Sequence, residues 1–392
     1  MESFFASVNQ SLYWKTCICL LIILLTCIQI WLFSRSNCVF TDKNQKMDMS
    51  KTDGGKLTYI AALNVFSALG VVMLHANGIF WSRPKGSLWL SANFIETFFY
   101  WPVPIFFMIT GATLIDYLRK YNTKVYFQKR ILRTFLPFIF WSMFACAFSV
   151  IYQGKAMDWN ILHIISNVFN TKYLRVYWFF PALFSIYLSI PLLALVGDKI
   201  RAFRYVIITG LVANMSLPLL CNIVHIPYNG QLKLDVAGGS LLYALTGYYL
   251  SRTEFSSRQR IVIYVSGIMG FLIHYFGTLV ASADQSAVVR TFKGYGNFPA
   301  FIQAVAVFVF FKYLFAKRQI SEHAKNILFK LSGLTFGIYL IHRYFLIFML
   351  NELSINAGSL MWRVIGAIFV FMLSAHIIML AKKIPFIRKV VP

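Results

Sequence analysis

Long apolar runs recur along the whole 392-residue sequence, and they constrain its fold more than any other feature. A helix needs about 20 apolar residues to cross the hydrocarbon core of a bilayer. The polar intervals between the runs are too short to build a soluble domain with its own core. Only 13% of the residues are charged, whereas about a quarter are charged in soluble proteins. The sequence therefore predicts an all-α fold, a polytopic transmembrane helical bundle.

We expect ten core spans and one N-terminal anchor helix. The anchor covers residues 14–33, and the charges after it, with no small-residue cleavage site, favour an uncleaved span. Residues 1–56 then comprise this anchor and a polar cytoplasmic linker, and residues 57–392 a single membrane domain. The predicted core spans are 57–80, 94–116, 131–153, 174–196, 203–224, 236–251, 260–281, 298–316, 331–351 and 358–381.

Basic residues gather in alternate loops and so predict the orientation of the chain. The formal net charge is +24, but the lysines and arginines lie in short intervals between apolar runs. This pattern indicates membrane orientation and argues against a nucleic-acid partner. The intervals that carry most of them are 34–56, 117–130, 197–204, 251–260, 316–330 and the C-terminal tail. By the positive-inside rule these intervals and the C-terminus face the cytoplasm, in a multi-pass protein of the inner or plasma membrane.

Histidines inside the spans are the first candidates for chemistry, because an ionisable group within a membrane is costly unless it is paired or hydrated. His75 lies near the outer end of the first core span. Imidazole titrates near neutral pH and is the usual general base. His342 lies within a later span, one helical turn after Tyr339. A purely structural hydrogen bond to a neighbouring group is the alternative for each histidine.

Two arginines mark the inner mouth of the third core span. Arg130 and Arg133 are three residues apart, so on a regular helix they share a face and could clamp a phosphate group. Topogenic charge is the alternative, and it explains Arg133 less well because that residue already lies inside the apolar run. Glu96 and Asp116, near the two ends of the second core span, could orient a histidine or simply lie at the interface.

Several common signatures are missing from the sequence. There is no phosphate-binding loop, no GxGxxG after a strand, no HExxH and no GxSxG. No pair among the six cysteines has metal-ligand spacing with a histidine partner. We therefore expect neither a metal site nor a bound cofactor. The absence of an internal duplication counts mildly against a secondary transporter built from two halves.

Six motifs occur in an order that resembles the integral-membrane acyltransferase 3 family. They are VVMLH ending at His75, VPIFFMITG ending at Gly111, KRILRTFLP with Arg130 and Arg133, WFFPALFSIYLSIP from Trp178, GYYL from Gly247, and GIYLIH ending at His342. The resemblance runs from about Tyr59 to Lys383, nearly the whole chain. Each motif alone is weak, but the six together in this order are specific.

The resemblance implies a bacterial enzyme that acylates sugars of surface glycans. The donor co-substrate would be an acyl-coenzyme A, most often acetyl-CoA, and the acceptor a glycan or lipid-linked sugar. His75 would be the catalytic base, or would be acylated transiently. Arg130 and Arg133 would bind the donor phosphates, and Tyr339 and His342 would line the channel or stabilise the oxyanion.

One position departs from the family pattern. Asn64, another candidate channel residue, stands where the family usually has an arginine. The resemblance implies that this arginine helps to bind or orient the acyl donor, so Arg133 would carry more of the phosphate binding here. Two other functions stay open at this point. One is a polytopic transporter or flippase for a glycan or lipid-linked sugar, and the other is a non-catalytic membrane partner.

Overall fold

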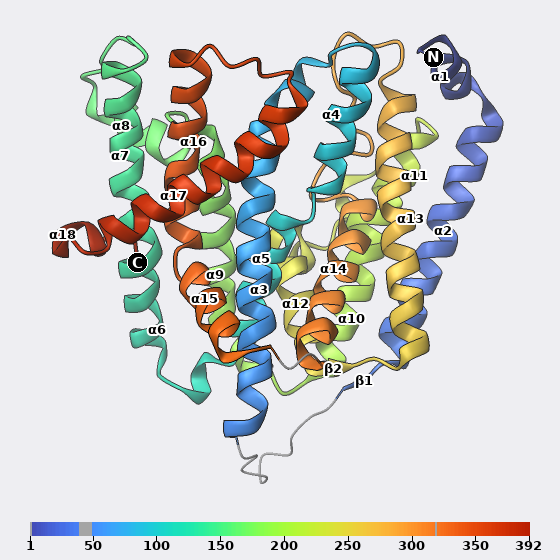
Figure 1. Ribbon diagram of the computed structural model, residues 1–392. Helices are drawn as coiled ribbons and strands as arrows, with labels where there is room; N and C mark the ends of the chain where they lie inside the picture. The colour runs from blue at the N-terminus through green and yellow to red at the C-terminus, as the bar shows by residue number, and fades with distance from the viewer. Residues whose placement is uncertain (1, 39–48, 318–319) are drawn as a thin grey trace.

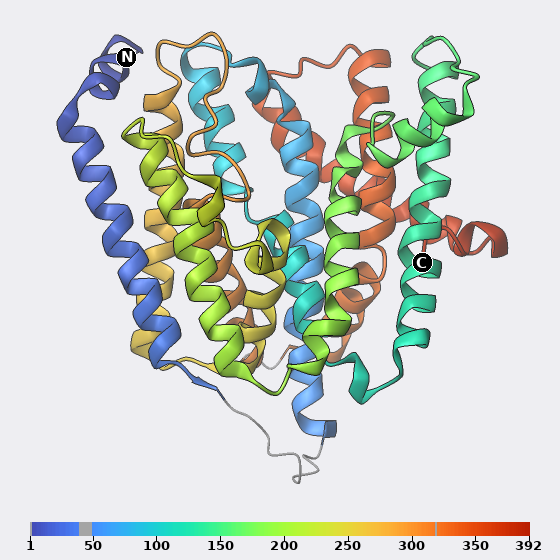
Figure 2. The same ribbon diagram turned by 180° about the vertical axis from the view of Figure 1, so that it is seen from behind.

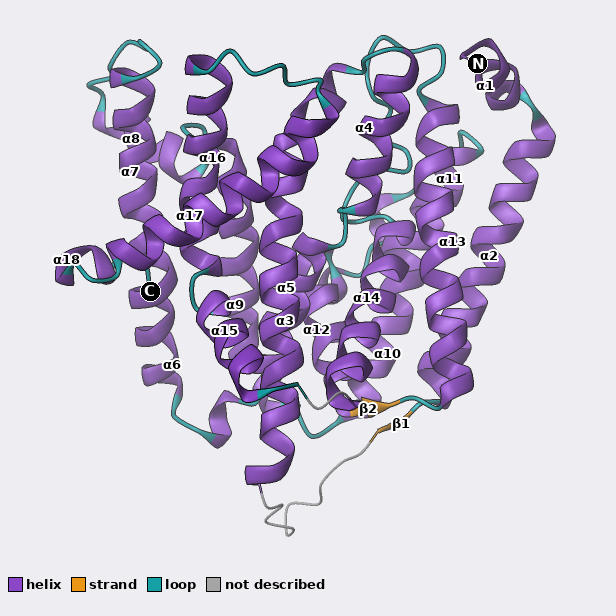
Figure 3. Ribbon diagram, viewed as in Figure 1, coloured by secondary structure: helices purple, strands orange, loops and turns teal. Residues whose placement is uncertain are grey.

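A computed structural model describes residues 2–38, 49–317 and 320–392 of the chain. The described residues form a bundle of long helices that run between an upper and a lower end as drawn in Figure 1. Their only strands are β1 (Asn37–Cys38) and β2 (Thr253–Glu254), which pair antiparallel at the lower end (Figure 3). The predicted all-α helical bundle is confirmed.

The α-helices, in chain order, are α1 Glu2–Gln10, α2 Leu12–Arg35, α3 Met49–Ala76, α4 Gly86–Phe98, α5 Pro102–Leu114, α6 Thr123–Arg130, α7 Leu136–Ile151, α8 Ile161–Phe169, α9 Phe179–Leu195, α10 Ile200–Gly210, α11 Leu217–Ile223, α12 Gly239–Arg252, α13 Ser257–Ala281, α14 Phe298–Lys317, α15 Glu322–Ser332, α16 Thr335–Glu352, α17 Ala367–Ala381 and α18 Pro385–Arg388. Short 3-10 helices lie at Gly78–Ser82, Tyr117–Arg119, Arg175–Trp178, Gly230–Leu232 and Asp235–Ala237. Turns of π-helix lie at Ile131–Phe135, Leu211–Ser216 and Trp362–Gly366.

The helices agree with the predicted spans at all but one position. In the described part of the chain, 9 helical segments are long and apolar enough to cross a membrane. A tenth is the pair α15 and α16, which bends by 59° at their junction. The remaining predicted span, 236–251, is α12, whose 14 residues measure about 21 Å and fall short of a bilayer crossing.

Regular structure occupies both ends of the predicted linker, residues 34–56. Helix α2 continues to Arg35, β1 follows, and α3 already begins at Met49. The rest of the predicted linker, residues 39–48, lies outside the described residues. Helix α2, the predicted anchor, packs at the edge of the bundle against α10, α11 and α13 (Figure 2).

Helix α3, which carries His75, lies at the centre of the bundle and runs from its lower to its upper end (Figure 1). It packs against α5, α14, α15, α16 and α17. Contacts on so many sides bury most of its apolar residues. The central position therefore places His75 among side chains from several distant parts of the sequence.

Helices α5 and α12 cross with their backbones in contact. A β-carbon on Gly111 would lie 1.8 Å from the carbonyl oxygen of Ala244, and one on Gly247 would lie 2.1 Å from that of Met108. Only glycine allows such an approach, and small residues commonly mediate helix packing in membranes. Both glycines belong to the motifs described above, so these two motifs have a packing role.

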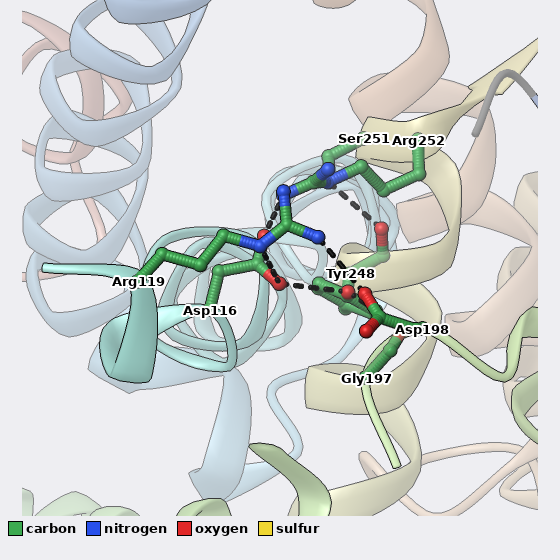
Figure 4. A network of polar contacts seen from close by, with 7 residues as sticks. All are labelled: Asp116, Arg119, Gly197, Asp198, Tyr248, Ser251 and Arg252. Carbon is green, nitrogen blue, oxygen red and sulfur yellow. Dashed lines mark hydrogen bonds and ion pairs between the residues drawn. The ribbon is translucent and has the colours of Figure 1, made fainter. Parts of the chain in front are cut away.

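A polar cluster at the lower end ties three segments together (Figure 4). Asp116, just after α5, pairs with Arg252 of α12 and accepts a hydrogen bond of 2.9 Å from the Tyr248 hydroxyl. Arg119 pairs with Asp198, between α9 and α10, at 2.9 Å. The partners of Asp116 are thus arginine and tyrosine side chains, and it does not orient a histidine.

Candidate active site

Two histidines from α3 and α16 meet inside the bundle. Nδ1 of His75 lies 2.7 Å from Nε2 of His342, and the planes of the two rings are 10° apart. His342 is fully buried, whereas His75 is partly exposed. The two histidines, which the sequence presents as separate candidates, therefore form one hydrogen-bonded pair.

A backbone carbonyl fixes the positions of the protons in this pair. Nδ1 of His342 lies 3.1 Å from the carbonyl oxygen of Ile338, which can only accept, so this nitrogen carries a hydrogen. In neutral His342, Nε2 is then an acceptor, and Nδ1 of His75 must donate to it. Nε2 of His75 keeps its lone pair and is the available base.

A guanidinium lies next to the histidine pair. Nη1 of Arg343 donates to the carbonyl oxygen of His75 at 3.5 Å. This carbonyl is among the last four of α3, which have no partner within the helix. Because helix carbonyls point toward the C-terminus and α3 ends at the top of the bundle, Arg343 lies on the upper side of His75 (Figure 1).

A basic pocket of about 830 Å³ lies on the other side of the pair. Arg133, Lys382 and Arg388 give it positive charge, and Pro392, the last residue of the sequence, also lines it. Its other lining residues include Ser332, Gly333, Phe336 and Val391. Phe336 precedes His342 by six residues on α16, so the pocket begins about 9 Å below the pair along that helix.

The structure separates the two arginines of the KRILRTFLP motif. Arg133 lines the basic pocket, but the Arg130 guanidinium lies over the rings of Tyr126, at 5.8 Å, and Tyr187, at 5.5 Å. The reason is the π-helical turn at Ile131–Phe135, which begins just after Arg130 and contains Arg133. A π turn is wider than an α turn, so residues three apart no longer share a face.

Asn64 and Tyr339 have different surroundings. The Asn64 amide donates to the hydroxyl of Ser332 at 3.4 Å, so it contacts the edge of the basic pocket. The Tyr339 hydroxyl donates to the carbonyl oxygen of Val176, and its ring centroid lies 6.0 Å from that of His342. Tyr339 therefore flanks the pair with its ring while its hydroxyl is bound to the backbone.

A comparison with protein families shows to which family the chain belongs. The family described as "Acyltransferase domain" matches residues 57–380. The chain belongs to this acyltransferase family. The match includes both histidines and the motifs that carry the resemblance described above, and it favours an enzyme over a transporter. A search of curated proteins found no match to the chain, and neither did a search of solved structures.

The acyltransferase also has a buried arginine that the sequence did not single out. Arg363, only 2% exposed, donates to the side-chain oxygen of Asn77 at 3.3 Å and to the Ser91 hydroxyl at 2.9 Å. Asn77 follows His75 by two residues, so these bonds hold the end of α3 in place. Arg363 stands at the start of a predicted span, where a basic residue is ordinary, and only the three-dimensional contacts reveal its role.

A buried lysine and glutamate lie close to this arginine in the acyltransferase. Lys293, in the connection between α13 and α14, donates to the Thr97 hydroxyl at 2.7 Å. Burial lowers the pKa of the Lys293 ammonium to about 7, and the neighbouring Glu96 carboxylate acts in the opposite direction. Glu96 lies beside Asn77 and Lys293, so its neighbours are not the histidine that it could have oriented. Among the described residues, no three His, Cys, Asp or Glu side chains form a group that could hold a metal ion.

Proposed function

We propose that this membrane acyltransferase moves an acyl group, in the first place acetyl, from cytoplasmic acyl-CoA to a sugar hydroxyl of a cell-surface glycan or exopolysaccharide. The observation that carries the proposal is the hydrogen-bonded pair of His75 and His342. A basic pocket begins about 9 Å from this pair along α16, and the chain belongs to an acyltransferase family. The pair supplies a base with a free lone pair, and the pocket supplies positive charge for an anionic donor.

The basic pocket supports the binding of coenzyme A. Arg133, Lys382 and Arg388 line it, and such side chains bind phosphate groups through charge-assisted hydrogen bonds. The pantetheine arm would extend from the pocket past Phe336 toward the histidine pair, a rise of about 9 Å along α16. We assign the lower end of the bundle to the cytoplasm, because the basic intervals that follow α5, α9 and α12 lie there (Figure 1), whereas the basic C-terminal segment with α18 lies at mid-height.

In the proposed reaction the acceptor hydroxyl approaches His75 from the upper end. Nε2 of His75 removes the hydroxyl proton while the oxygen attacks the thioester carbonyl carbon. The tetrahedral intermediate then collapses: the C–S bond breaks, the ester is complete, and the imidazolium returns the proton to the leaving thiolate. His342 accepts the Nδ1 hydrogen of His75 throughout, and so it orients the ring and stabilises its charged form.

Release of coenzyme A from acetyl-CoA by the purified protein tests this proposal. We expect His75→Ala to reduce the rate by about a hundredfold or more, as for loss of a general base. His376→Ala is the matched control, since His376 is an exposed imidazole of α17 and should leave the rate unchanged. A folded His75→Ala variant that releases coenzyme A at the full rate would refute the assignment.

A further inference from the structure

Arg343 is a positive charge inside the bundle without an acidic partner in the described part of the chain. No described carboxylate lies within ion-pair distance of it. Its one hydrogen bond among the described residues is the contact of 3.5 Å to the His75 carbonyl oxygen. A guanidinium has five N–H donors, and a charge within a membrane is costly unless it is paired or hydrated. Arg343 thus has binding capacity that the described protein does not use.

The neighbouring ionisable groups do not supply the missing negative charge. Arg363 and Lys293 are two further cations at this end of the bundle, and Glu96 is the carboxylate beside Lys293. If Glu96 balances Lys293, both arginines still lack a carboxylate, and arginine stays protonated in proteins. This surplus of positive charge favours an anionic group near His75.

Arg343 stands on the side from which the acceptor would arrive. It contacts the carbonyl of His75, which points toward the upper end of α3, whereas the basic pocket lies below the histidine pair. The donor and Arg343 are therefore on opposite sides of the His75 imidazole. A group bound by Arg343 would lie next to the hydroxyl that His75 deprotonates.

Capping of a helix end is the alternative role, because a cation is favourable at a helix C-terminus. Arg363 shows what a structural arginine looks like in this bundle: it is 2% exposed and donates to two side chains. Arg343, in contrast, is partly exposed and donates to no side chain among the described residues. Capping explains its contact with the His75 carbonyl but leaves its other donors without a role.

We infer that Arg343 binds an anionic group of the acceptor, so the acceptor is a glycan with a phosphate or carboxylate close to the acylated hydroxyl. The planar guanidinium fork suits both groups, which it can bind through two parallel hydrogen bonds. This inference rests on the proposed function, because it assumes that a sugar hydroxyl meets His75. It adds the chemical class of that sugar.

Three small sugars can serve as probes of this subsite: glucuronic acid, glucose 6-phosphate and glucose. The measurement is the concentration at which each probe half-maximally changes the His75-dependent release of coenzyme A by the purified full chain. At least one anionic probe should act at about tenfold lower concentration than glucose, as expected for a charge-assisted hydrogen bond. The stronger of the two identifies a carboxylate or a phosphate as the preferred group.

Variants assign this preference to Arg343. Arg343→Gln should remove the difference between the anionic probes and glucose, and Arg343→Lys should keep part of it. Lys172→Gln removes the same charge from an exposed position in the connection between α8 and α9 and should keep the full difference. If Arg343→Gln does not fold, two results still test whether Arg343 binds the anion. They are the preference of the wild type for an anionic probe over glucose and the partial loss of that preference in Arg343→Lys.

Three results would overturn the inference. They are equal action of all three probes, a preference that persists in Arg343→Gln, and an effect of the anionic probes that excess acetyl-CoA abolishes, since this would place them in the basic pocket. Failure of the proposed function looks different. In that case the wild type shows no His75-dependent release of coenzyme A before any sugar is added.

Discussion

The two histidines of the pair have different roles because a backbone carbonyl oxygen accepts the Nδ1 hydrogen of His342. Ile338 accepts the Nδ1 hydrogen of His342, and this forces the hydrogen between the rings to belong to His75. The base is therefore Nε2 of His75, and His342 is the group that orients it. The arrangement has the logic of a catalytic triad, with an imidazole in place of the carboxylate.

Replacement of His342 tests this division of roles. We expect His342→Ala to lower kcat by about a hundredfold or more, because His75 loses the acceptor that orients it, while the KM for acetyl-CoA changes little. His342→Gln should retain more activity, since its amide oxygen can accept the hydrogen from His75. Steady-state kinetics of both variants measure kcat and the KM for acetyl-CoA. A rise in KM with unchanged kcat would contradict this division of roles and make His342 a substrate-binding residue.

The two arginines of the KRILRTFLP motif should respond differently to substitution. Arg133→Gln should raise the KM for acetyl-CoA about tenfold, the cost of one charge-assisted hydrogen bond, because Arg133 lines the basic pocket. Arg130→Gln should leave KM unchanged and lower the stability by about 1 kcal/mol through loss of the contacts with Tyr126 and Tyr187. Equal effects of the two variants on KM would contradict this assignment.

The sequence identified both histidines as candidates, but it did not predict that they form a pair. His75 and His342 are 267 residues apart in the chain, and helix periodicity says nothing about such distant contacts. The expectation that Arg130 and Arg133 share a face assumed a regular α-helix, and nothing in the local sequence predicts the π turn at Ile131–Phe135. Arg363 was missed because an arginine near a span end also serves as a topology signal.

At the level of helices, the apolar runs predicted most elements because length and hydropathy alone decide whether a helix can cross a membrane. The structure differs from the predicted elements at α12 and at the junction of α15 and α16. Helix α12 is only 14 residues long, although its apolar sequence resembles that of a full span. The 59° bend between α15 and α16 lies at the start of the predicted span 331–351, where the charged helix α15 meets the apolar helix α16.

The crossing of α5 and α12 gives a test at this scale. Gly247→Ala should destabilise the protein by about 2 kcal/mol or more, because its methyl group would meet the Met108 backbone. Gly230→Ala is the control, since a β-carbon there has nothing within 4 Å. Thermal unfolding in detergent should show a lower midpoint for Gly247→Ala alone. Equal unfolding midpoints for the two variants would contradict this prediction, because they would mean that α5 and α12 can move apart with little loss of stability.

For acyl-CoA to enter the basic pocket, the lower end of the molecule must face the cytoplasm. Lys120 is exposed in the connection from α5 to α6, which lies at the lower end, and Lys172 is exposed in the connection that follows α8, at the upper end (Figure 1). In a background without the native cysteines, a membrane-impermeant maleimide applied to intact cells should label Lys172→Cys and leave Lys120→Cys unlabelled. Both should react after the membrane is opened. The reverse labelling pattern would place the basic pocket outside, away from acyl-CoA.

The most direct test of the account supplies acetyl-CoA, which does not cross a bilayer, to one face of the protein at a time. Proteoliposomes of known orientation allow this, and the quantity measured is free coenzyme A. We predict release only when the donor is on the face that bears Arg133, and loss of this release in His75→Ala. Release from donor on the opposite face, or release that persists without His75, would contradict the proposal that the histidine pair receives its acyl group through the basic pocket.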